Sequence, residues 1–94
     1  MTDPLERLQR QFIARCRAEL EQLRTLAAHD PELGLIAHRL AGAAGSFGYP
    51  EVSEAAAVVD ELVRSGTDPA PDDILDLTAS LERALAREPK PGRD

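Results

Sequence analysis

The sequence has few aromatic residues: no tryptophan, one tyrosine and two phenylalanines among 94 residues. It also lacks runs of β-branched residues, whereas alanine, leucine, glutamate and arginine are abundant, which is typical of helical proteins. Its one cysteine, Cys16, cannot form an internal disulfide, so we interpret it as a small core residue. A chain of this length can bury one core of its own, and we therefore expect a single all-α domain.

Long hydrophobic runs are also missing. No apolar run approaches the ~18 residues of a membrane-spanning helix, and no charged-then-apolar signal sequence opens the chain. The net charge of -6, without a basic stripe on any predicted helix, argues against nucleic acid and against anionic membrane surfaces as partners. We therefore expect a cytoplasmic protein with no nucleic-acid partner and no membrane partner.

The two histidines, His29 and His38, have none of the spacings of a metal site. Di-iron bundles use Glu-x-x-His motifs, but the positions three residues before the histidines hold Leu26 and Leu35. Zinc is disfavoured because no second cysteine is present. The glycine-rich segment 42–48 follows no predicted strand, so we do not interpret it as a nucleotide-binding loop. We expect no cofactor of its own, and His29 is interpreted as a solvated residue near a helix end.

Hydrophobic periodicity and capping residues predict four helices. The first runs from about Pro4 to Ala28 behind Asp3, and the second begins at Pro31 behind Asp30 and ends near Gly48. The others cover residues 50–64, closed by a Ser-Gly pair, and residues 72–87, after a loop over 67–71. Short connections between amphipathic helices predict an antiparallel up-down four-helix bundle over residues 1–88, followed by a flexible tail over 89–94.

Each predicted helix has one apolar stripe that we expect to face a shared core, because the residues recur at steps of three and four. The four stripes, in chain order, are Leu5, Leu8, Phe12, Cys16, Leu20, Leu23 and Ala27; Leu33, Ile36, Leu40, Ala43, Ala44 and Phe47; Val52, Ala55, Ala56, Val59, Leu62 and Val63; and Ile74, Leu77, Thr78, Leu81 and Leu85.

The most informative residue is His38 in the second predicted helix. At about 100° per residue it lies almost opposite the apolar stripe and should face water. Its neighbours on that face are Gly34, Ala41, Gly42 and Gly45, all of them small. Each glycine inside a helix costs roughly 1 kcal/mol relative to alanine, so a surface helix without a function is not expected to carry them. We interpret this face as a surface without bulky side chains around His38, which leaves the imidazole accessible to a large partner.

An exposed imidazole without accompanying groups is typical of a group carrier. Imidazole is a nucleophile as well as a base, but the sequence suggests no Ser/His/Asp set around His38. A ring nitrogen can receive a phosphoryl group and pass it on, with the partner protein supplying the catalytic groups and the metal.

The segment from Ala37 to about Leu62 resembles the histidine-containing phosphotransfer (HPt) domain of two-component phosphorelays. The pattern of that family is a histidine, any two residues, lysine, glycine and then further glycines among small residues. His38, Gly42, Gly45 and Gly48 match it at the same spacings. The run from Gly45 to Tyr49 is most similar to the phosphotransfer domain of chemotaxis histidine kinases.

The resemblance implies roles for the matching residues. His38 would be phosphorylated, at Nε2, and Gly42 and Gly45 would leave room for the active-site loops of the partner. In the chemotaxis branch an acidic residue on the next helix hydrogen-bonds the other ring nitrogen, and the matching position is Asp60. A carboxylate there would fix the tautomer of the ring and raise its nucleophilicity. The alternative is that Asp60 is a solvated acid on the flank of its helix.

One matching position departs from the family, because Ala41 stands where the family has lysine. Its replacement removes a cation that normally lies close to the phosphoryl group. Arg39 points about 100° away around the helix, and its long side chain either partly substitutes for that cation or lies on a solvated face. Leu35 lies on the His38 side, where it is either a hydrophobic docking contact or a single exposed leucine without a role.

Three hypotheses for function follow. The first is a phosphocarrier without its own ATP site, monomeric, which moves a phosphoryl group on His38 between a sensor histidine kinase or a receiver-domain aspartate and a response-regulator receiver domain, with Mg²⁺ supplied by the partner. The second is a phosphorylation-silent adaptor that binds receivers or kinases without phosphotransfer. The third is a structural four-helix module, which would leave the glycines around His38 unexplained.

Overall fold

The computed structural model describes residues 3–88, and within that range it contains helices and no strand. The α-helices are α1 (Pro4–Leu23), α2 (Pro31–Ala43), α3 (Pro50–Arg64) and α4 (Pro71–Ala86), and a short 3₁₀ helix, η1 (Gly45–Phe47), follows α2. The all-α fold predicted from composition and periodicity is confirmed. The predicted tail, residues 89–94, lies outside the described residues.

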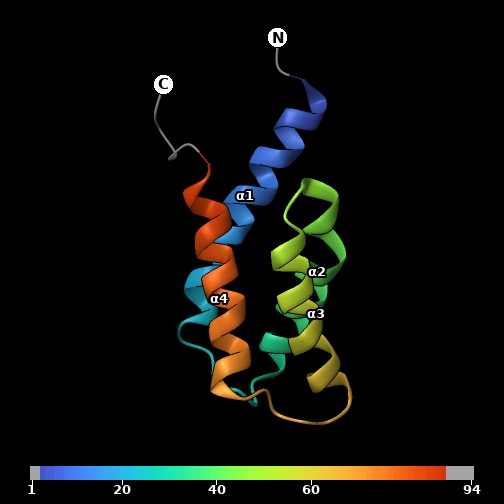
Figure 1. The fold of residues 1–94 in the computed structure, drawn as a ribbon, viewed down its shortest axis with the longest axis vertical. Helices are drawn as coiled ribbons and strands as arrows, with labels where there is room; N and C mark the ends of the chain where they lie inside the picture. The colour runs from blue at the N-terminus through green and yellow to red at the C-terminus, as the bar shows by residue number, and fades with distance from the viewer. Residues whose placement is uncertain (1–2, 89–94) are drawn as a thin grey trace.

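The four helices lie side by side as a bundle (Figure 1). In Figure 1 the chain descends through α1, ascends through α2, descends through α3 and ascends through α4. Helix α3 packs against both α2 and α4, and α4 packs against α1. Consecutive helices therefore run in opposite directions, and α2 and α3 form the closely packed hairpin that carries His38.

Aspartate and proline residues define the helix starts. The Asp3 carboxylate accepts the backbone N–H of Leu5 at 3.0 Å, and that of Asp30 accepts the backbone N–H of Glu32 at 2.9 Å, as expected of N-caps. Helix α4 begins at Pro71, one residue before the predicted start, and ends at Ala86 instead of residue 87. The missing N–H of proline costs nothing at the first helical position, so Pro71 belongs to the helix rather than to the loop.

The first two helices end earlier than predicted. Helix α1 ends at Leu23, not Ala28, because the backbone turns sharply there: the hydroxyl and the N–H of Thr25 both donate to the carbonyl of Gln22. Helix α2 ends at Ala43 and continues only as the tighter η1, instead of running unbroken to Gly48. Gly48 then adopts φ 90°, a left-handed conformation that glycine accepts without strain, which confirms it as the stop.

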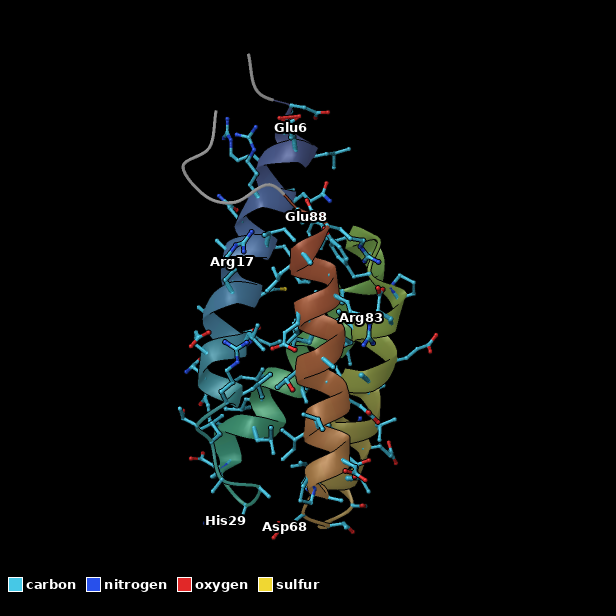
Figure 2. The ribbon with its side chains drawn as sticks, turned by 60° about the vertical axis from the view of Figure 1, so that its left-hand side comes forward. Glu6, Arg17, His29, Asp68, Arg83 and Glu88 are labelled. Carbon is cyan, nitrogen blue, oxygen red and sulfur yellow. The ribbon has the colours of Figure 1, made fainter. Side chains whose placement is uncertain are left out.

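The core follows most of the predicted stripes. Eighteen buried hydrophobic residues from all four helices and their connections form one cluster, which includes Cys16. Leu5 and Leu8 were predicted to face this core but are 72% and 50% exposed, because the first turns of α1 extend beyond the ends of the other helices (Figures 1 and 2). Ala27 is also exposed, since it follows the end of α1 and is no longer on a helix face.

All three aromatic side chains gather at the end of the bundle where α2 gives way to η1. The ring of Phe12 on α1 stacks on Phe47 with centroids 4.6 Å apart, and the ring of Tyr49 lies 6.1 Å from that of Phe12. These contacts fix η1 against α1 and so hold the chain immediately after the His38 helix in place. In the part of the chain that the structure describes, no helix combines the length and apolar character that a membrane crossing requires.

Candidate functional site

His38 projects from the middle of α2 into solvent, as the helical periodicity predicts. Its side chain is 68% exposed, whereas its neighbour Ala37 and the next apolar residue, Leu40, are completely buried on the other side of the helix. The imidazole is therefore held on a helix whose opposite face is packed into the core, and most of its side chain is accessible to a macromolecule.

Gly42 and Gly45 leave open ground next to the imidazole. A Cβ atom added at Gly42 would meet nothing within 4 Å, and one added at Gly45 would only touch the Ser53 side chain at 3.8 Å. Neither glycine is required by local packing or by a positive φ. The absence of a side chain at these two positions therefore leaves space on the protein surface, not in the interior. Leu35 adds an exposed apolar side chain, 55% accessible, on the same helix.

Gly34 was predicted to belong to this open ground, and that prediction is wrong. Gly34 is buried, and a Cβ atom added there would lie 2.7 Å from Cγ1 of Val63. Its missing side chain allows α2 and α3 to approach closely one turn before His38. Ala41 is also partly buried against the core, and its carbonyl accepts the hydroxyl of Ser53 at 2.8 Å, which ties α2 to α3 after His38.

This close packing brings Asp60 of α3 to His38. Nδ1 of His38 lies 3.3 Å from Oδ2 of Asp60, and the Asp60 side chain is only 13% exposed. An ionised carboxylate can only accept a hydrogen bond, so this bond requires the proton to be on Nδ1. In the neutral ring Nε2 then carries the lone pair. Of the two interpretations of Asp60, the geometry matches the one in which the carboxylate contacts the ring, and its role in phosphotransfer stays a prediction.

The same oxygen of Asp60 has a second neighbour that the sequence patterns did not single out. Nη1 of Arg64, one turn further along α3, lies 3.6 Å from Oδ2 of Asp60. The Arg64 side chain is 66% exposed, so this is a surface ion pair on the edge of the site. The spacing of four residues between acid and base was visible in the sequence, but only the contact with His38 gives it significance.

Arg39 points away from His38, toward α1. Its Nη2 and Nε lie 2.8 and 3.3 Å from Oε2 of Glu19, and Nη2 lies 4.0 Å from Glu32. Glu19 is buried, at 3% exposure, and its other carboxylate oxygen has no hydrogen-bond partner among the described residues, so Arg39 serves as the counter-ion of a buried acid. Arg39 therefore neither reaches toward the ring nor lies on a purely solvated face. A signal for Glu19 was present, since this acid follows Cys16 by three residues on the apolar stripe of α1.

The other histidine, His29, does not belong to this site. His29 is exposed in the turn between α1 and α2, and Figure 2 shows it at the same end of the bundle as Asp68. Because α1 ends at Leu23, His29 does not cap that helix as the sequence suggested. Among residues 3–88 there is no group of three or more His, Cys, Asp or Glu side chains that could hold a metal ion.

An exposed histidine on a helical hairpin, with an acid from the second helix on its inner nitrogen, is the arrangement that the resemblance to HPt domains implies. A comparison with protein-family models matches the Hpt domain over residues 7–87. The match covers most of the chain, and the chain therefore belongs to the Hpt domain family, whose members carry phosphoryl groups on histidine in phosphorelays and interact with receiver domains and kinases. Comparisons with curated proteins and with solved structures found no match. The particular similarity to chemotaxis kinases stays a prediction.

Proposed function

We propose that this chain is a phosphocarrier that accepts a phosphoryl group on Nε2 of His38 and passes it to the aspartate of a response-regulator receiver domain. The donor would be a sensor histidine kinase or the phosphorylated aspartate of another receiver. The observation that carries the proposal is the pairing of an exposed imidazole with the carboxylate of Asp60 at Nδ1. The proposal includes no ATP site on this chain.

In this proposal, the pairing of Nδ1 with Asp60 selects Nε2 as the ring nitrogen that reacts. With the proton on Nδ1 and its hydrogen bond directed at Asp60, the lone pair of Nε2 is free to attack the phosphorus atom. The N–P bond forms as the bond from phosphorus to the leaving oxygen breaks, and that oxygen keeps the electron pair. The phosphorylated ring retains its Nδ1 proton and becomes cationic, and the adjacent carboxylate of Asp60 stabilises this charge.

The onward step reverses this chemistry on the partner. A carboxylate oxygen of the receiver aspartate attacks phosphorus, the N–P bond breaks, and its electron pair returns to Nε2 of His38. We propose that the Mg²⁺ this transfer needs is held by the partner, because it has to neutralise charge on the phosphoryl group and on the receiver aspartate together. The open ground at Gly42 and Gly45, with Leu35 beside it, would seat the receiver's loops.

A phosphorylation-silent adaptor is the second candidate, and the observation that favours it is Ala41. The position of the family's lysine holds a methyl group that is partly buried against the core, so α2 supplies no cation there. Such an adaptor would bind receivers or kinases through the same surface without taking up phosphate.

The test is phosphotransfer from a panel of receiver domains that have been phosphorylated in the presence of Mg²⁺, followed by the assay of acid-labile, base-stable phosphate on this chain. The phosphocarrier predicts label that is lost in His38→Gln and retained in the matched control His29→Gln, which removes the other exposed histidine. Binding of a receiver without label would favour the adaptor. Neither label nor binding across the panel would contradict both.

A further inference from the structure

The phosphoryl site lacks a cation from its own helix. Ala41 has no charge to offer, and the guanidinium of Arg39 is drawn to the buried Glu19 on α1. A phosphoryl group on Nε2 carries up to two negative charges, and these need donors if the group is to be held and transferred. Within residues 3–88, the cation in contact with the His38–Asp60 pair is Arg64, through Asp60.

Arg64 is placed to supply a cation to a phosphoryl group on His38. Its Nη1 and Nδ1 of His38 lie 3.6 and 3.3 Å from the same atom, Oδ2 of Asp60, so the two nitrogens can be no further apart than these distances combined. Nε2 lies only one ring carbon beyond Nδ1, on the solvent side. Arg64 sits in the last turn of α3 and is 66% exposed, so nothing encloses its side chain and its ion pair with Asp60 is weak.

We propose that Arg64 leaves Asp60 when His38 is phosphorylated and donates hydrogen bonds from its guanidinium to the phosphoryl oxygens. This inference rests on the proposed function and extends it with a phosphoryl-binding residue on α3. The planar fork of the guanidinium matches the spacing of phosphoryl oxygens, and its charge is permanent. Arg64 forms no covalent bond and keeps its protons. The N–P bond still breaks with its electron pair returning to Nε2, while the phosphoryl group moves to the receiver carboxylate.

The movement would also benefit Asp60. In the unphosphorylated protein its Oδ2 is shared between Nδ1 of His38 and Nη1 of Arg64. After phosphorylation the ring is cationic and the phosphoryl group is anionic, so the arrangement of lowest energy pairs Asp60 with the ring and Arg64 with the phosphoryl group. One arginine would thus neutralise the phosphoryl group and free the carboxylate that stabilises the ring.

The experiment uses a His29→Gln background, in which His38 is the only histidine, loaded with potassium phosphoramidate so that the loading step needs no partner protein. In this background Arg64→Ala and Arg64→Lys are compared with Arg10→Ala. Arg10 is the matched control, since it forms the same type of exposed pair, four residues from its acid, with Glu6 on α1. Two quantities are measured: the pKa of the phosphorylated His38 ring, followed by ³¹P NMR titration, and the rate of transfer to a receiver domain.

We expect Arg64→Ala to raise the pKa of the phosphorylated ring by about half a unit, because a phosphoryl dianion without its cation favours the protonated ring, and to slow transfer by about tenfold. Arg64→Lys should restore part of both, and Arg10→Ala should change neither. Unchanged pKa and rate in Arg64→Ala would overturn the inference. Slower transfer with an unchanged pKa would also overturn it, since Arg64 would then have no effect on the charge of the phosphorylated site. If the parent protein cannot be loaded at all, the proposed function fails first and this inference with it.

Discussion

Nδ1 of His38 and Oδ2 of Asp60 lie 3.3 Å apart, across the interface between α2 and α3. The acid is nearly covered while the histidine is exposed, so the inner nitrogen of the ring is engaged and the outer nitrogen is left to react. The pair exists because two helices approach closely enough for a short aspartate side chain to reach.

Removal of the Asp60 carboxylate should weaken phosphotransfer. Asp60→Ala eliminates the acceptor for Nδ1–H, and groups that orient a reactive histidine typically contribute about 10- to 100-fold to its function. We expect a loss in that range in the rate of transfer from a phosphorylated receiver, and ¹⁵N NMR should show a shift of the proton from Nδ1 toward Nε2. Glu61→Gln, a change at the adjacent exposed acid, is the control and should alter neither quantity.

Two glycines of α2 should respond to alanine in opposite directions. Gly34→Ala places a methyl group 2.7 Å from Cγ1 of Val63 and should reduce the free energy of unfolding by about 1–3 kcal/mol. Gly42→Ala meets nothing and should raise it by about 0.5–1 kcal/mol, the usual gain of alanine over glycine in a helix. Urea unfolding measures both changes.

A double variant tests whether residue 34 contacts Val63 directly. In Gly34→Ala combined with Val63→Ala, Cγ1 is gone and the nearest remaining atom of residue 63 is Cβ, at an ordinary 3.5 Å. The double variant should therefore be less destabilised than the two single variants added together. Additive losses would contradict a direct contact at this point.

The Glu19–Arg39 pair should contribute to stability rather than to phosphotransfer chemistry. Arg39→Met leaves the carboxylate of Glu19 buried without a counter-ion and should cost about 2 kcal/mol, a value lowered here because Arg39 itself is 43% exposed. Arg10→Met, which breaks an exposed pair with Glu6, should change stability by less than about 0.5 kcal/mol. Equal urea midpoints for the two variants would contradict the importance assigned to the buried acid.

The Cys16 thiol should be inert in the folded protein. Burial raises the pKa of Cys16 from 9.0 to about 12, and the nearby carboxylate of Glu19 adds to the effect. At pH 8 we expect an aromatic disulfide reagent to modify Cys16 only in urea. Fast modification of the folded protein would show that this part of the core opens readily.

The same shift links stability to pH. Below pH 9 the thiol is protonated in both the folded and the unfolded state and has no effect on stability. Between about pH 9 and 12 the unfolded thiol ionises while the folded one stays protonated, so the unfolded state is favoured and stability falls. Urea unfolding of Cys16→Ala should lose this part of the pH dependence relative to the unchanged protein.

Much of this architecture is predictable because it depends on periodic patterns. The stripes through Leu33, Ile36 and Leu40 locate the core face of α2, and the exposure of His38 follows from the same periodicity. The fold class and the uncovered surface at Gly42 and Gly45 were therefore accessible from periodicity, whereas Asp60 was singled out by the resemblance to the HPt family.

The rest depends on contacts between helices, which periodicity does not encode. Gly34 and Gly42 look alike in the sequence, and only the position of Val63 shows that one serves packing and the other does not. Glu19 decides the direction of Arg39 from a different helix. The end of α1 was misplaced because apolar spacing continues by chance through the turn after Leu23.

The central claim is that Nε2 of His38 carries the phosphoryl group. The most direct test is NMR of protein with ¹⁵N-labelled histidine, phosphorylated by its receiver or kinase partner and kept at neutral to basic pH. The result we predict is one phosphohistidine, with phosphorus coupled to Nε2 of His38 and the proton retained on Nδ1, and no change at His29. Phosphate on Nδ1 of His38 or on His29, or a partner that binds without phosphorylating either histidine, would contradict it.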